Sequence, residues 1–354
     1  MNKLVRYSVG HGAGNLIADD SGVLVIGNSF PSTSSTSMYG VASDFSGNLY
    51  ISDSANSTIY RVTESGSISL FAGTVGAEGS NDGTTTVARF KNPHGMAVDK
   101  SGNIYIADTG NGSVRVVNSS GSVGTVATGL VSPWGVACAA NGDVYVTDMG
   151  DHCVYRVRRA DGPLASAATV IAGAPGTSGD ISAEYGQSAR FDSPTGIAVD
   201  PSGYILVADS GNDKIKRIGL DGFVVLFCGS GTNGNVYGTF QNAQFTDLGA
   251  MTCDKSGNLY VADITSVGDN YIKLVNQNGD CAEVSKVSGG HVLGITATPG
   301  GVVYITCAYA TGTNSSSSMS SSSLSSSSLS SLSSQSSSSI SSSSKSSSST
   351  STTP

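Results

Sequence analysis

The stretch "GMAVDKSGNIYIADTGNGSVRVV", Gly95 to Val117, places a turn signal, an apolar run, a second turn signal and a second β-rich run within 23 residues. The same pattern recurs along the chain. Its other copies begin at Gly40, Gly135, Gly196, Ala250 and Gly294, and the last two are less regular. Repetition at a regular spacing is the signature of a repeat architecture rather than of one isolated hairpin.

Each copy predicts a four-stranded antiparallel meander. Asp99 opens a turn in which Gly102 follows three positions later, at a place that demands a left-handed backbone. The next run, residues 104–107, is apolar on both faces, which suits a sheet covered on both sides. Asp108 then starts a second turn with Asn111 three residues on, and such side chains hydrogen-bond nearby backbone N–H groups. A third strand, a small turn and a fourth strand complete the unit.

Four-stranded units that cannot bury both faces alone stack radially into a propeller, usually with about 4 to 8 blades. The last copy supplies only two strands, Val292 to Ala297 and Val302 to Thr306. The segment Asn15 to Asn28 aligns with the missing third and fourth strands. We therefore predict an all-β fold, a six-bladed β-propeller whose last blade is closed by N-terminal strands. Seven blades, with a degenerate first blade, are the alternative.

The repeat resembles the NHL-repeat family, whose members form such propellers. The resemblance rests on "NPHGMAVDKSGNIYIADTGNGSVRVV" and "SPTGIAVDPSGYILVADSGNDKIKRI" and covers roughly residues 14 to 310. The expected domain is residues 1–312. Residues 313–354 are nearly all serine and have too little apolar surface to offset chain entropy, so we expect a disordered tail. A flexible extension and a glycosylated or phosphorylated stalk both remain open for it.

Charge and composition limit the partners. The formal net charge of −8 opposes the phosphate attraction that supplies most nucleic-acid affinity. Basic third-strand residues such as Lys214, Lys216 and Arg217 are interpreted as solvated. No secretory signal core and no apolar run of about 18 residues is visible. A monomer is expected, and the compartment stays open, with the serine-rich tail compatible with an extracellular or cell-surface location. The six cysteines form no CxxC pair. Cys138 and Cys253 are interpreted as small buried hydrophobes, and an isolated disulfide is left open.

The family resemblance raises the alternative of an enzyme acting at the central channel, because related propellers include a zinc-dependent lyase and lactonases. A zinc site of the lyase kind needs three converging histidines. The residues expected around one channel mouth are Tyr39, His94, Trp134, Thr195, Gly249 and Leu293. With one histidine among them, we predict no metal and no cofactor, although a channel calcium is left open. A non-enzymatic binding module is favoured over an enzyme and over a structural head on a serine-rich stalk.

Loop length indicates the binding face. Three connections between blades are long, residues 73–88, 173–189 and 229–243, and long loops on a rigid scaffold are often functional. They should emerge on the same side as Tyr39, His94 and Trp134. The further candidates on them are Asp82, Asp180, Glu184, Tyr185, Tyr237 and Phe240. An aromatic patch with an acidic rim suits a protein, peptide or glycan. The alternative is that the loops are spacers and Trp134 packs between blades.

Overall fold

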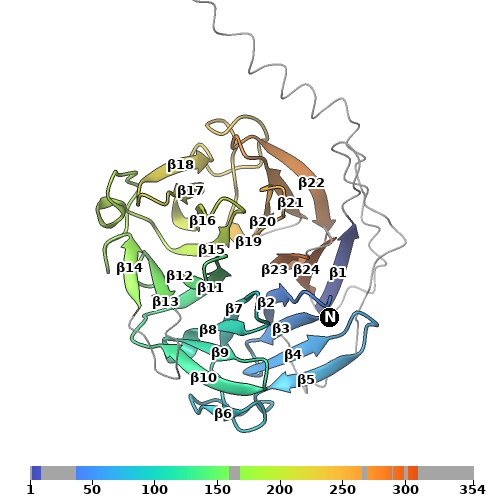
Figure 1. Cartoon of the computed structure of the whole chain (residues 1–354). Coiled ribbons are helices and arrows are strands. Elements are labelled where there is room, and N and C mark those ends of the chain that lie inside the picture. The colour runs from blue at the N-terminus through green and yellow to red at the C-terminus, as the bar shows by residue number, and fades with distance from the viewer. Residues whose placement is uncertain are drawn as a thin grey trace, which may run out of the picture.

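Six antiparallel sheets surround a central channel in the part of the chain that the structure describes (Figure 1). This computed structural model describes residues 2–8, 37–158, 168–264, 269–288, 290–298 and 302–309. The predicted serine-rich tail, residues 313–354, lies outside these ranges. Within them, no helix is long and apolar enough to cross a membrane. The sequence therefore predicted the all-β propeller and its blade number correctly.

Each complete blade places its strands in chain order from the channel to the rim. Blade I comprises β2 (Met38–Ser43), β3 (Leu49–Asp53), β4 (Thr58–Val62) and β5 (Ile68–Ala72). Blade II comprises β7 (Pro93–Val98), β8 (Ile104–Asp108), β9 (Ser113–Val117) and β10 (Ser122–Ala127), with the short β6 (Gly83–Thr84) outside β10. Blade III comprises β11 (Pro133–Cys138), β12 (Asp143–Asp148), β13 (Cys153–Arg158) and β14 (Thr169–Ala172).

The remaining sheets continue the ring. Blade IV comprises β15 (Pro194–Val199), β16 (Ile205–Asp209), β17 (Lys214–Ile218) and β18 (Val224–Cys228). Blade V comprises β19 (Leu248–Cys253), β20 (Leu259–Asp263), β21 (Asp269–Val275) and β22 (Cys281–Ser288). Blade VI comprises β23 (Gly290–Ala297), β24 (Val302–Tyr309) and β1 (Asn2–Ser8). Among the described residues, the helical elements are single 3₁₀ turns, η2 (Thr109–Asn111), η3 (Gly186–Ser188) and η4 (Ser210–Asn212).

The local geometry follows the repeat pattern. In the first turn of blade II, the Gly102 N–H donates to the Asp99 carbonyl over 3.0 Å, and Gly102 has φ of +77°. In the second turn, Asn111 Nδ2 donates to Asp108 Oδ2 over 2.8 Å. Every residue of β8 is buried, as expected for a strand covered on both faces. The turn chemistry and the apolar run together therefore place the first three strands of the blade.

The N-terminal segment closes the ring, as predicted, but with a different strand. Asn2–Ser8 forms β1, which pairs antiparallel with β24, Asn2 opposite Ala308 and Ser8 opposite Val302. Asn2–Ser8 thus takes the third-strand place that the sequence assigned to the beginning of Asn15–Asn28, a segment that lies outside the described residues.

Neighbouring blades meet backbone to backbone along the channel. A Cβ atom added at Gly40 would lie 2.1 Å from the His94 carbonyl oxygen, so only glycine fits there. The Ser52 hydroxyl donates to the same oxygen over 2.6 Å and accepts from the Gly40 N–H over 2.8 Å. Thr147 in blade III makes the equivalent bridge to the Thr195 carbonyl. These contacts fix the first strands against one another and set the shape of the channel.

The long linkers follow the outer edges of the blades. The linker into blade II contributes β6, which pairs with β10 at the rim. Ala183, in the linker into blade IV, exchanges both backbone hydrogen bonds with Val224 of β18. Gly238, in the linker into blade V, does the same with Cys281 of β22. Each linker thus covers a sheet edge that would otherwise present unpaired backbone groups.

Candidate functional site at the channel mouth

An irregularity near the start of each first strand builds the mouth of the channel. The pairing of the first two strands shifts register between Met38 and Val41 in blade I and between Pro93 and Met96 in blade II. Blades III to VI show the same shift. A bulge of this kind re-aims the side chain within it. Tyr39 and His94 lie within these shifts and line the mouth, as the sequence predicted.

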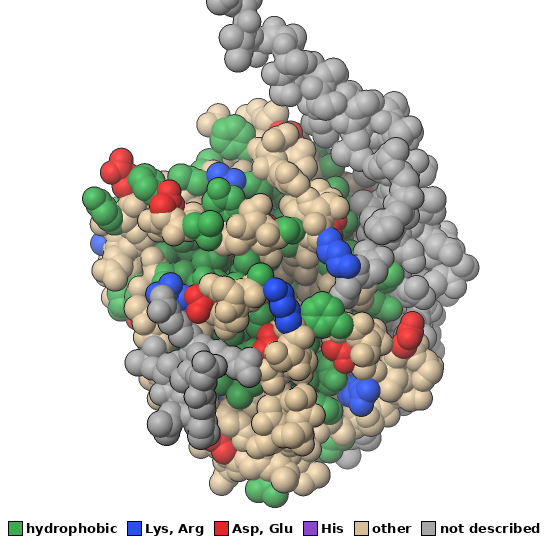
Figure 2. All heavy atoms as spheres, in the orientation of Figure 1, with side chains coloured by type: hydrophobic (Ala, Val, Ile, Leu, Met, Phe, Trp, Pro, Cys, Tyr) green, Lys and Arg blue, Asp and Glu red, His purple; other side chains and the backbone are tan. Residues whose placement is uncertain are grey.

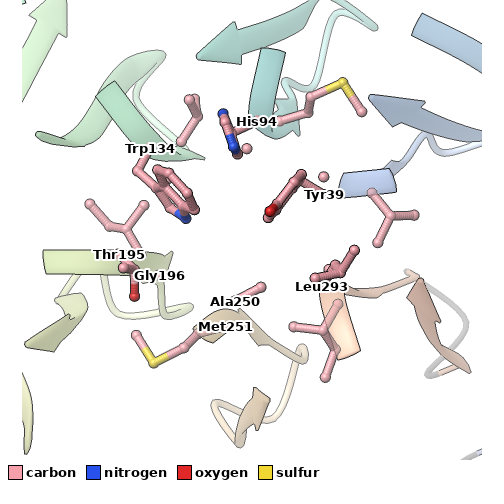
Figure 3. Close-up of a pocket in the computed structure, with 17 residues that line it drawn as sticks. Tyr39, His94, Trp134, Thr195, Gly196, Ala250, Met251 and Leu293 are labelled. Atoms are coloured by element: carbon pink, nitrogen blue, oxygen red, sulfur yellow. The ribbon is translucent and has the colours of Figure 1, made fainter. Parts of the chain in front are cut away.

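Three aromatic side chains gather on one side of the mouth (Figure 3). The rings of His94 and Trp134 are stacked, with centroids 4.0 Å apart and planes at 27°. Tyr39 lies 4.4 Å from His94 and meets Trp134 edge-on at 5.8 Å. We call Tyr39, His94 and Trp134 the aromatic arc. Such offset and edge-to-face arrangements stabilise aromatic pairs beyond the area they bury.

His94 is the most buried member of the arc, with 8% of its surface exposed. Its Nδ1 lies 2.9 Å from the Asn92 carbonyl oxygen and 2.9 Å from Thr109 Oγ1. Burial lowers the pKa of His94 to about 4, against a smaller opposing effect of the Asn92 carbonyl. The imidazole is therefore neutral at physiological pH, and the arc carries no charge.

The opposite side of the mouth is aliphatic and small. Thr195, Ala250 and Leu293 line it, so Ala250 takes the lining place beside the predicted Gly249 (Figure 3). The Thr195 hydroxyl already donates to the Leu248 carbonyl over 2.7 Å. The space between the two sides is a cavity of about 60 Å³. This side of the mouth therefore offers a ligand few free polar groups, and it suits an apolar group.

A ring of six apolar side chains forms the floor of the mouth. We call this the aliphatic ring; its members are Val41, Met96, Val136, Ile197, Met251 and Ile295. Each is buried, with 4 to 7% of its surface exposed. The same six residues also line a second cavity of about 230 Å³ further along the channel. The ring thus belongs to the lining of both cavities.

The second cavity corrects the interpretation of two cysteines. Cys138 and Cys253 line it and are half-buried rather than fully buried. Burial raises the pKa of both thiols, and nearby aspartates raise it further, so both are protonated at neutral pH. All six cysteines are free in the structure, and the thiols of Cys228 and Cys281 lie in hydrogen-bond contact.

Asp82, a candidate on the first long linker, lies against a buried arginine. Arg115 is fully buried in β9 and donates to Asp82 Oδ1 over 2.6 Å and to Asp108 Oδ2 over 2.9 Å. Its guanidinium also lies 5.3 Å from the centre of the Phe90 ring, within cation–π range. The linker carboxylate therefore helps to compensate a cation inside the blade.

Asp180 has the same surroundings in blade IV. Lys216 Nζ lies 2.9 Å from Asp180 Oδ1 and 2.7 Å from Asp209 Oδ2, and Lys214 also binds Asp180. Lys216 is 1% exposed, which corrects the interpretation of it as a solvated residue. It lies 5.1 Å from the centre of the Phe191 ring, which the linker places over it. Lys216 is therefore buried because the linker packs over this strand.

The other linker candidates also lie at the rim. In blade V, Tyr237 donates a hydrogen bond to Glu283, and Lys273 lies 5.4 Å from its ring centre. Tyr185 is 74% exposed and Phe240 37% exposed. Glu184 is exposed as well. None of these residues lines the mouth cavity, so the structure brings together the aromatic arc but not the linker candidates.

Potential metal ligands are dispersed. No group of three or more His, Cys, Asp or Glu side chains is placed to hold a metal among the described residues. His11 lies outside those residues, and His291 is exposed on β23. His152 accepts a hydrogen bond from the Ser193 N–H over 3.0 Å. His94 is thus the histidine that the described residues place at the mouth.

Charged side chains are scattered over the surface. In Figure 2, the coloured Lys and Arg side chains and the Asp and Glu side chains alternate with uncharged surface on the face in view. They form no continuous patch of one sign there. A face of this kind lacks the basic stripe that a phosphate backbone requires.

Comparison with known proteins identifies the repeat. The model of the NHL repeat matches residues 90–117 and 191–218. Each match runs from the linker phenylalanine, Phe90 or Phe191, to the end of the third strand. The chain therefore contains NHL repeats at these two positions and folds as a β-propeller, as the sequence predicted. The search among curated proteins returned no match.

Solved structures share the fold at low sequence identity. A chain of a nidogen/laminin complex is 17% identical with a TM-score of 0.56, covering 84% of this chain and 98% of that one. A gluconolactonase from Xanthomonas campestris is 15% identical with a TM-score of 0.52, covering 77% and 86%. An auxiliary nutrient binding protein from Bacteroides ovatus is 16% identical with a TM-score of 0.53, and the match spans 66% of this chain and 58% of that one. These similarities show the fold alone.

Sequence reasoning missed the residues that support the arc. Thr109 holds His94 from the next turn, and Met96 and Met251 lie in the floor. A signal for the floor was present, because the residue after the first-strand glycine, or after Ala250 in blade V, is apolar in every repeat. The signal for the buried cations was a shared linker ending, Ala-Arg-Phe or Ala-Gln-Phe, ahead of each blade that carries one.

Proposed function

We propose that this propeller is a non-enzymatic binding module whose channel mouth accepts an apolar or aromatic side chain of a protein or peptide partner. The observation that carries the proposal is the uncharged aromatic arc above the aliphatic ring. Partly exposed aromatic residues beside a small apolar pocket are typical of the anchor points of protein interfaces. Tyr39 and Trp134 retain exposed surface at the mouth, so a partner can reach them.

The lining supports binding in preference to acid–base catalysis. Among its described residues, the titratable side chains are Tyr39 and His94. His94 is neutral, and its pKa of about 4 leaves it a weak base. One structural neighbour is an enzyme, a gluconolactonase, and another comes from a protein complex, nidogen with laminin. The choice between these functions therefore rests on the site and not on the fold.

A peptide suits the mouth better than a glycan. Sugar hydroxyls that enter an apolar site lose hydrogen bonds to water and need protein partners in return. Here the floor consists of six apolar side chains, and the Thr195 hydroxyl is already engaged. An apolar side chain has no such need and gains by leaving water. The mouth thus favours the tip of a protein side chain.

The test uses the full chain with two probes, a displayed library of random peptides and a glycan array. We expect enrichment of peptides with a shared apolar or aromatic residue, and at least about a tenfold loss of affinity on Trp134→Ala. Tyr185→Ala is the matched control, because it removes an exposed aromatic ring away from the mouth. Peptide binding that survives Trp134→Ala, or binding confined to the glycan array, contradicts the proposal.

A further inference from the structure

The hydrogen bonds of His94 select one tautomer of its ring. The Asn92 carbonyl can only accept, so the Nδ1 atom 2.9 Å away must carry the proton. Thr109 Oγ1, also 2.9 Å from Nδ1, donates its own proton to the Pro133 carbonyl oxygen over 2.6 Å. The hydroxyl therefore faces Nδ1 as an acceptor too. Both neighbours require Nδ1–H, which leaves Nε2 with a free lone pair.

Nε2 is the unused polar atom of the ring. It has no hydrogen-bond partner among the described residues, and it is absent from the fully buried polar atoms that lack one. His94 lines the mouth cavity, while Tyr39 and Trp134 cover its two flanks. Nε2 is thus a hydrogen-bond acceptor at the entrance, beside the Tyr39 hydroxyl and the Trp134 indole. A ligand that covers it without donating a hydrogen bond leaves it buried and unpaired, which is costly.

From this geometry we infer that His94 makes the mouth selective for a planar ring with an N–H or O–H donor at its edge. The inference rests on the proposed function and names the anchor, the phenol of a tyrosine or the indole of a tryptophan in the partner. Phenylalanine and leucine would fill the same space but leave Nε2 unpaired. His94 is thereby assigned as a specificity-determining residue.

The size of the cavity agrees with entry of a ring edge. Its volume of about 60 Å³ is well below the ~150 Å³ of an apolar cavity that encloses a whole benzene molecule. Only the leading edge of an aromatic ring therefore passes the arc. The thioethers of Met96 and Met251 in the floor adapt readily to such an edge and make favourable contacts with it.

The experiment compares ring fragments that differ only in the donor: phenol with anisole, and indole with 1-methylindole. Nitrogen NMR of the histidine-labelled full chain reports on His94 directly. In the free protein we expect a protonated Nδ1 and an unprotonated Nε2. Phenol and indole should shift the Nε2 resonance and bind about fivefold or more tightly than their methylated analogues.

A variant separates the hydrogen bond from the stacking. His94→Phe retains an aromatic ring between Tyr39 and Trp134 but removes Nε2, so phenol and anisole should then bind equally. If the variant does not fold, the Nε2 shift in the unmodified protein decides. Equal affinities in the unmodified protein, or an Nε2 resonance that phenol leaves unmoved, overturn the inference. Peptide enrichment that depends on Trp134 would still stand in that case, whereas its loss would overturn the proposed function itself.

Discussion

Blades II and III carry different residues at the centre of the third strand, and these residues are covered in different ways. At the centre of its third strand, blade II carries Arg115, paired opposite Ile106, whereas blade III carries Tyr155 at the same place opposite Val146. Arg115 is compensated by two aspartates and covered by Phe90 from a long linker. Tyr155 makes a single hydrogen bond, to Asp151. The linker that leads into its blade, residues 128–132, is short.

Blades IV and V resemble blade II. Both have long linkers, and they carry Lys216 and Lys273 at the centre of the third strand. Each buried cation also donates to a linker carbonyl, that of Arg89, Arg190 or Gln244. In blades II to V, a long linker and a buried third-strand cation therefore occur together. The comparison shows that much of each long linker serves to cover a charge.

Exchanging a linker should give the largest effect. Replacing residues 173–193 with the sequence of residues 128–132 removes Phe191 and Asp180 and exposes Lys216. The loss of the buried Phe191 side chain alone should cost about 3–5 kcal/mol of unfolding free energy. We expect a protein that is largely unfolded at 37 °C, as judged by circular dichroism and thermal melting.

The second arm of this experiment adds Lys216→Tyr to the exchanged linker, so that blade IV carries the same pair of features as blade III. Folding should then recover in part, because no cation remains to be covered. If the exchanged linker leaves the melting temperature unchanged while Lys216 is present, the claim that the long linker serves to cover the cation is wrong.

Arg115→Met should have the next largest effect. It leaves Asp108 buried without its cation, and breaking a buried pair from one side costs about 3–5 kcal/mol. Denaturant unfolding measures this loss. Adding Asp108→Asn to Arg115→Met should restore part of it, because the unpaired charge is then gone.

Tyr155→Phe in blade III is the matched control for Arg115→Met. It removes one hydrogen bond between Tyr155 and Asp151, worth about 1 kcal/mol. A loss as large as that of Arg115→Met would mean that the two blade types do not differ in the way proposed.

Asp180→Asn should give the smallest effect, with a defined pH dependence. Burial alone raises the pKa of Asp180, but hydrogen bonds from Lys214 and Lys216 outweigh it and the pKa is lowered. The ionised carboxylate therefore stabilises the fold above the ordinary pKa near 3.8, and this contribution is lost as the pH falls through the lowered value.

The measurement is the difference in unfolding free energy between the unmodified chain and Asp180→Asn. Because Asp180 is partly exposed, it should be about 1 kcal/mol or less above pH ~5 and should shrink in more acidic solution. Glu184→Gln, which removes an exposed carboxylate in the same linker, is the matched control. A difference that grows on acidification would contradict the sign.

The sequence predicted what depends on local patterns. Turn pairs such as Asp99 and Gly102, repeated at each copy, located the strands and the blade number. The same register placed Tyr39, His94 and Trp134 at one mouth, because a repeat puts equivalent residues at equivalent places. The packing of the three rings against one another follows from the radial arrangement of the blades, which no single repeat encodes.

What escaped prediction depends on contacts between distant segments. Lys216 is a polar residue by type, and it is buried because a linker that ends 23 residues earlier, before Pro194, folds over it. The pairing of Asn2–Ser8 with β24 likewise joins the two ends of the propeller. The half-burial of Cys138 depends on the width of the channel, which six blades set together.

The aliphatic ring has a consequence for the coupling between the two cavities. Because the same six side chains line both, one belt of apolar residues borders the aromatic entrance on one side and the cavity lined by Cys138 and Cys253 on the other. A change in one ring side chain therefore alters the lining of both cavities together.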